Sequence, residues 1–98
     1  MSDVDVDAIR LSPLDNVATV LRPVASGESL RVRCGGEVVP VLAREAIPLC
    51  HKISLAAIAP GAPVVKYGQP IGDAFAAIGE GCHVHVHNMR SARARASA

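Results

Sequence analysis

Apolar and polar residues alternate along much of the chain from Ser29 onward. In the segment SLRVRC (29–34), three apolar residues alternate with polar ones, which predicts a half-buried strand. Two glycines follow and predict a hairpin, with EVVPVLA (37–43) as the returning strand. Because proline has no backbone N–H, Pro40 places that returning strand at an edge or a bulge of the sheet.

Further short strands are expected on both sides of this hairpin, separated by turns that contain Gly and Pro. The segment SPLDNVATVLRP (12–23) is different, because Leu14, Val17, Ala18 and Leu21 recur at helical spacing after the N-cap candidate Ser12. It predicts one short helix. No internal repeat is apparent. The other expected strands lie at 4–11, around 50–53, and at 62–68, 69–78 and 82–88.

The composition indicates one small domain with a surface that is covered by something else. The chain has 98 residues, of which 50% are hydrophobic but only 2% aromatic, so its core consists of small branched side chains. Charged residues make up 19%, against about 25% in typical domains. The net charge of +1 gives no electrostatic reason to bind nucleic acid or an anionic membrane. No apolar run approaches the roughly 20 residues of a membrane span.

The cysteines and the chain ends favour a cytoplasmic protein. Cys34, Cys50 and Cys82 are odd in number and lack CxxC spacing, which favours reduced thiols. The acidic N-terminus lacks the features of a signal peptide. We expect a folded domain over residues 1–89 and a disordered, Arg- and Ala-rich tail over residues 90–98.

The segment GCHVHVHNM (81–89) holds the main candidate chemistry. On one continuous strand, His83, His85 and His87 would share a face, with Val84 and Val86 turned to the core. Neighbouring rings would then start about 6.5 to 7 Å apart, and two of them can converge on one metal ion. The third needs a bend in the strand. We therefore predict His83 and His85 as metal ligands; a polar strand face is the alternative.

Other polar residues could complete such a site. His51 and Lys52 are adjacent, so on a strand only one of them points to a given face. Lys66 can bind a carboxylate, although a solvated lysine at a strand edge is the favoured interpretation. Asp73 and Glu80 are the acids near the C-terminal histidines, whereas a complete enzyme usually needs more. The residues thus indicate a small β domain that contributes to a site it does not complete.

Three segments in this order resemble the SAF domain of the altronate/galactarate dehydratase family. They are DNVATVL (15–21), HKISLAAIAPGAPVVKYGQPIG (51–72) and AAIGEGCHVHVHNM (76–89). The resemblance implies a mainly β, β-clip (SAF-like) domain with one or two short helices. It also implies the small (alpha) subunit of a two-subunit lyase of the sulfolactate sulfo-lyase type.

The resemblance further implies β-elimination from a hydroxy acid, with loss of water from a sugar acid or of sulfite from sulfolactate. The partner would be a large catalytic subunit, and the isolated chain would lack turnover. A divalent metal is implied, with iron favoured. His51 and His87 become candidates for acid–base roles, and Lys52, Lys66 and Asn88 for substrate binding. The alternative is a stand-alone SAF-type carbohydrate-binding or assembly module without catalysis.

Overall fold

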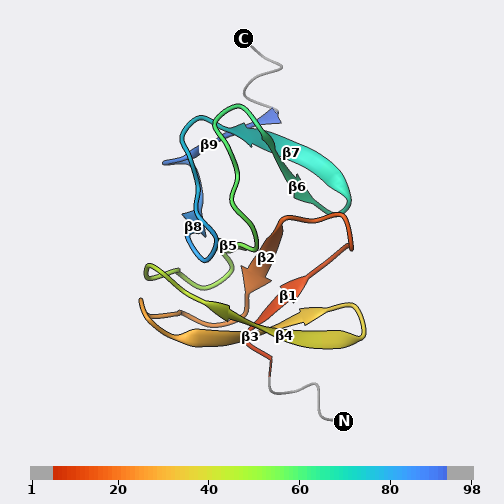
Figure 1. Ribbon diagram of the computed structural model, residues 1–98, viewed down its shortest axis with the longest axis vertical. Coiled ribbons are helices and arrows are strands. Elements are labelled where there is room, and N and C mark those ends of the chain that lie inside the picture. Colours follow the sequence, from red (N-terminus) through yellow and green to blue (C-terminus); the bar gives the residue numbers. More distant parts are fainter. Residues whose placement is uncertain (1–5, 93–98) are drawn as a thin grey trace.

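The computed structural model describes residues 6–92, which form nine strands in two sheets (Figure 1). The six-stranded sheet has the order β4-β3-β1-β2-β5-β8, and the three-stranded sheet has the order β6-β7-β9. The expectation of a mainly β domain is confirmed. The strands are β1 (Ala8–Arg10), β2 (Val17–Val20), β3 (Ser29–Cys34), β4 (Glu37–Leu42), β5 (Lys52–Ser54), β6 (Pro63–Lys66), β7 (Gln69–Ala74), β8 (His83–Val84) and β9 (Met89–Ser91).

The β3–β4 and β6–β7 hairpins follow the local sequence closely. β3 and β4 pair around Gly35 and Gly36, with Cys34 opposite Glu37. β4 is the outermost strand of its sheet, which confirms the edge position expected from Pro40. Two residues reverse the chain in each hairpin: Tyr67 and Gly68 of the β6–β7 turn both have positive φ, and in the β3–β4 turn Gly35 does.

The helix expected over residues 12–23 is wrong. The first half of this segment is a turn, and the second half forms β2, which pairs with β1 on one side and β5 on the other. Asp15 is only 5% exposed, and its carboxylate accepts the backbone N–H groups of Ser12, Tyr67 and Gly68 at 2.8 to 3.1 Å. The acid therefore ties this turn to the β6–β7 hairpin rather than capping a helix.

A ten-residue turn recurs four times, at residues 21–30, 44–53, 55–64 and 75–84. The expectation that the chain has no internal repeat is therefore also wrong. The copies are joined in two pairs by isolated bridges, Val24 with Ile47 and Ile58 with Ile78. In each copy the fourth and tenth residues are buried and the seventh has positive φ. The seventh residues are Gly27, Cys50, Gly61 and Gly81.

The strands enclose two adjoining apolar cores. In Figure 1, β1 to β4 gather at one end, β6, β7 and β9 at the other, and β5 and β8 lie between them. Ile53 of β5 belongs to the first core, whereas Val84 of β8 belongs to the second. The first core comprises Ala8, Ala18, Val20, Val24, Leu30, Val32, Val41, Ala43, Ile47 and Ile53. The second comprises Val17, Ile58, Val64, Ala74, Ile78, Val84 and Met89.

The last expected strand, 82–88, is broken. β8 stops after two residues, residues 85–88 turn, and β9 joins the other sheet. β9 includes Arg90, the first residue of the expected tail, whereas residues 93–98 lie outside the described part. No helix within residues 6–92 is long and apolar enough to cross a membrane.

Gly81 and Gly61 occupy the same place in two copies of the repeat and provide a matched test. Both have positive φ, but a Cβ on Gly81 would lie 2.1 Å from the backbone oxygen of Leu42, while a Cβ on Gly61 meets nothing within 4 Å. Gly61→Ala should cost about 1–2 kcal/mol of unfolding free energy through φ alone. Gly81→Ala should cost about 4 kcal/mol or more, because a backbone atom must move. Urea denaturation measures both, and equal losses would contradict the close approach.

Candidate functional site

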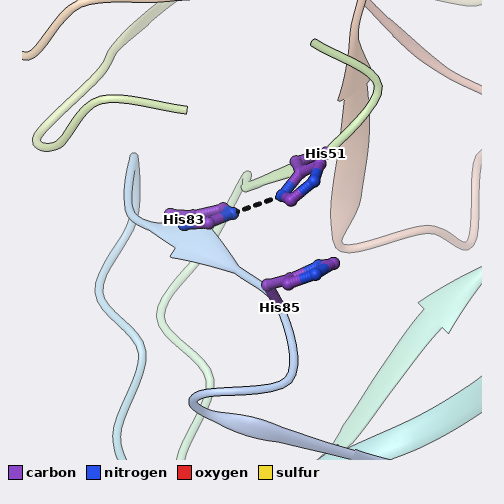
Figure 2. A group of neighbouring side chains, drawn as sticks. All are labelled: His51, His83 and His85. Atoms are coloured by element: carbon purple, nitrogen blue, oxygen red, sulfur yellow. Dashed lines mark hydrogen bonds between the residues drawn. The ribbon is translucent and has the colours of Figure 1, made fainter. Parts of the chain in front are cut away.

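Three imidazole rings converge where β5 begins and β8 ends (Figure 2). His51 Nδ1 lies 2.8 Å from His83 Nε2, so one ring donates a hydrogen bond to the other. The ring centroids of His51 and His85 are 4.0 Å apart, and those of His83 and His85 are 5.6 Å apart. One nitrogen from each of the three rings lies within 4.8 Å of the others. Such a cluster can hold a metal ion.

The strand register brings these rings together. β5 and β8 are antiparallel, with Ile53 opposite His83, so the residue opposite His85 is His51. Because alternate residues of a strand share a face, the pair Ile53–His83 and the pair His51–His85 lie on the same side of the sheet. Backbone hydrogen bonds of 3.0 Å link Val20 to both Cys50 and His51 and hold the start of β5 against β2. The structure thus brings His51, and not Lys52, to the other histidines.

The side chain of Asn88 bonds to the backbone of the histidine segment at the break after β8. Its Nδ2 donates to the backbone oxygen of His83 at 2.8 Å, and its Oδ1 accepts the backbone N–H of His85 at 3.0 Å. Asn88 is 9% exposed, so this amide faces the backbone of the histidine segment rather than open solvent. A substrate contact of Asn88 stays a prediction.

The turn changes the expected positions of the last two strand residues. Val86 is 72% exposed, so its assignment to the core is wrong. His87 is exposed in the turn, and its ring centroid lies 5.0 Å from that of His83 at an angle of 41°. The bend therefore brings His87 beside the cluster, although its nitrogens are not part of the close group of three.

The two lysines lie outside the group of three histidines. Lys52 is half-buried, and burial followed by repulsion from Lys66 lowers its pKa. The charge of Lys52 in turn contributes to the lowered pKa of His85, after burial and His51. The Nζ of Lys66 lies 5.0 Å from the centre of the Tyr67 ring. Substrate binding by either lysine stays a prediction.

Glu45 is a residue of the site that the sequence analysis missed. Its Oε2 accepts the backbone N–H of His83 at 3.1 Å, across a separation of 38 residues. A hydrogen bond to Glu45 also adds to the effect of burial in raising the pKa of the Cys82 thiol. No local pattern marks Glu45, because only the docking of the β4–β5 loop brings it to β8.

Burial and mutual repulsion lower the pKa values of His83 and His85 and so favour the neutral form of these two rings. Burial is the largest cause that lowers the pKa of His83, followed by the charges of His87, His51 and His85. The pKa of His85 is lowered first by burial and then by His51, Lys52 and His87. Neutral imidazole is the form that binds metal, so this environment favours ligation.

The distance between His51 Nδ1 and His83 Nε2 is close to that between two ligands of one transition-metal ion. Two imidazole nitrogens bound at about 2.0–2.1 Å to a tetrahedral ion lie about 3.3 Å apart. His51 and His83 would have to separate only slightly from 2.8 Å and exchange their hydrogen bond for bonds to the ion. Three nitrogen ligands leave a fourth position open for water or substrate. Imidazole suits zinc, iron, copper and nickel.

A family profile for the altronate/galactarate dehydratase SAF domain matches residues 6–92. The chain belongs to this SAF domain family. It is 43% identical over 83 residues to altronate dehydratase of Escherichia coli (strain K12), covering 85% of this chain but 16% of that enzyme. It is 40% identical over 50 residues to (2R)-sulfolactate sulfo-lyase subunit alpha of Chromohalobacter salexigens, covering 51% of this chain and 53% of that subunit. The corresponding subunit of Paracoccus pantotrophus is 39% identical over 51 residues, which cover 52% of this chain and 76% of that subunit.

The lowered histidine pKa values predict how the stability of this SAF domain depends on pH. The ordinary histidine pKa is 6.5, and that of His83 is lower in the folded state. Below about pH 6.5 the unfolded chain therefore binds more protons, so the unfolding free energy should fall as the pH decreases. We expect His83→Gln to flatten this dependence between about pH 7 and 5 in metal-free protein. Urea denaturation across this range tests it, and identical pH profiles for parent and variant would contradict it.

Proposed function

We propose that this SAF domain is the small subunit of a β-eliminating lyase that acts on a hydroxy acid, such as a sugar acid or sulfolactate. Its role is to bring the histidine cluster to an active site shared with a large catalytic chain. The observation that carries the proposal is the convergence of His51, His83 and His85 on one face (Figure 2). The similarity to altronate dehydratase and to sulfo-lyase alpha subunits supports the class of reaction.

In this proposal a metal ion and the side chains of the chain have different roles in the elimination. Elimination removes the proton next to a carboxylate and expels a leaving group from the neighbouring carbon. A divalent ion held at the histidine cluster, for which we favour iron, would supply Lewis-acid stabilisation of the negative charge that develops on that carboxylate. His51, His83 and His85 would hold the ion. His87, exposed beside them, can transfer a proton, and the ammonium groups of Lys52 and Lys66 would attract the substrate carboxylate.

The remaining catalytic groups come from the partner in this proposal. The acid in contact with the histidine segment within residues 6–92 is Glu45, and its carboxylate is engaged with the backbone of His83. Leu49 and Val86, which lie within two residues of His51 and His85 in the sequence, have exposed fractions of 50% and 72%, and a covering chain would remove both from water. The free thiols Cys34, Cys50 and Cys82 agree with a complex that works in the cytoplasm.

Purification from native extract tests this proposal. A tagged chain should recover a large partner together with a divalent metal, and the complex should eliminate water or sulfite from a hydroxy acid. The double variant His83→Ala/His85→Ala should recover the partner but lose the metal, because two of three ligands are gone. Lys66→Ala is the control that should retain metal. Metal content is measured by elemental analysis of the purified complex.

Three outcomes would contradict the proposal. Turnover by the purified chain alone would exclude a shared active site. Full metal retention by the double variant would show that the histidines are an ordinary polar face and not a metal site. Recovery of the chain without any large partner would favour a stand-alone carbohydrate-binding or assembly module.

A further inference from the structure

The outer edge of β8 is occupied by side chains instead of a strand. β8 is the last strand of the six-stranded sheet, so only β5 pairs with it. An edge strand leaves backbone N–H and C=O groups without strand partners on its open side. Here the backbone N–H and C=O of His83 and the backbone N–H of His85 all receive partners from side chains.

Two residues provide these partners. Glu45 Oε2 accepts the N–H of His83 at 3.1 Å. The amide of Asn88 spans the next two groups, donating to the oxygen of His83 at 2.8 Å and accepting the N–H of His85 at 3.0 Å. Together they reproduce the hydrogen bonds that a neighbouring strand would make.

Glu45 is itself held in place by the backbone around it. The backbone N–H of Arg44 donates to the oxygen of Gly81 at 2.9 Å, and the backbone of Leu42 approaches Gly81 too closely to leave room for a Cβ. The β4–β5 loop is thereby fixed against the turn that leads into β8. The docked loop therefore positions the Glu45 carboxylate at the backbone N–H of His83.

A strand of two residues needs such support to hold its side chains. β8 ends after Val84, and the chain turns at once, so β5 is the only strand that pairs with His83, and His85 lies at the start of the turn. Short edge segments open locally at low free-energy cost. Hydrogen bonds on the outer edge fix the backbone of both histidines and hence the direction of their rings toward His51.

We propose that Glu45 and Asn88 are positioning residues that replace a neighbouring strand and hold His83 and His85 in ligating geometry with His51. Neither residue belongs to the group of three close ligand atoms, so they act through the histidines. The consequence for metal affinity rests on the function proposed above, whereas the consequence for ring geometry does not. Loss of such outer partners typically weakens metal binding by about 10- to 100-fold.

Titration of the full chain with Co²⁺, followed by visible absorption, tests the role of Glu45. Glu45→Ala removes the acceptor and should weaken Co²⁺ binding by about 10- to 100-fold, with altered absorption bands. Glu45→Gln keeps an acceptor oxygen and should bind within a few-fold of the parent. Glu37→Ala is the matched control, because it removes the same charge from the exposed β3–β4 hairpin and should leave binding unchanged.

Asn88 is tested with a variant that keeps its size. Asn88→Asp retains an acceptor for the N–H of His85 but replaces the donor to the oxygen of His83 with a second acceptor. It should weaken Co²⁺ binding by about 10-fold or more, with the fold verified by its circular dichroism spectrum. Parent-like affinity in folded Asn88→Asp would overturn the role of Asn88.

A metal-free measurement separates this inference from the proposed function. Ring-to-ring nuclear Overhauser effects between His51 and His83 should be present in the parent, Glu45→Gln and Glu37→Ala, and lost in Glu45→Ala. If the parent binds no Co²⁺ but this pattern holds, the metal site fails and the positioning role stands. Retained ring contacts in Glu45→Ala would overturn the positioning role. So would Glu45→Gln binding as weakly as Glu45→Ala, because charge rather than the hydrogen bond would then be responsible.

Discussion

The antiparallel register of β5 against β8 is the constraint on which both the fold and the site depend. With Ile53 opposite His83, one face of this pair carries the histidines and the other carries Val84 into the second core. A shift of one residue would exchange the two faces, burying imidazoles and exposing a core valine. The apolar cores therefore specify the histidine geometry, since the register that fills them is the register that gathers the rings.

The repeated turn explains how such a small chain maintains that register. Each copy places one bulky apolar residue in a core and then reverses the chain at a residue with positive φ. Three copies use glycine there, whereas the copy before His51 uses Cys50, at φ 71°. A non-glycine residue in this region costs about 1–2 kcal/mol. Backbone hydrogen bonds to Val20 hold this turn, so its conformation is maintained by tertiary contacts.

Local patterning predicted the parts of the fold that local chemistry determines. The β3–β4 hairpin follows from alternation and two glycines, and Pro40 correctly marks an edge. The helix over 12–23 failed because the apparent helical spacing coexisted with a Val- and Thr-rich strand that two neighbours pair with. The repeat was missed because only three positions keep their character in all four copies, although the copies at 55–64 and 75–84 share the pattern AAIxxGxxV. The relation of these two to the copies at 21–30 and 44–53 becomes clear only when burial and φ are known.

The site shows the same division between local and distant information. His83 and His85 could be paired from their spacing, but His51 comes from 32 residues away and its choice over Lys52 required the strand register. Glu45 could not be found at all, because its role exists only after the β4–β5 loop docks on the turn at Gly81. The ligand group thus forms only when the domain folds. A metal ion held at the proposed site would bind the folded state alone and would stabilise the fold by linkage, so a modest apolar core and the metal would support each other.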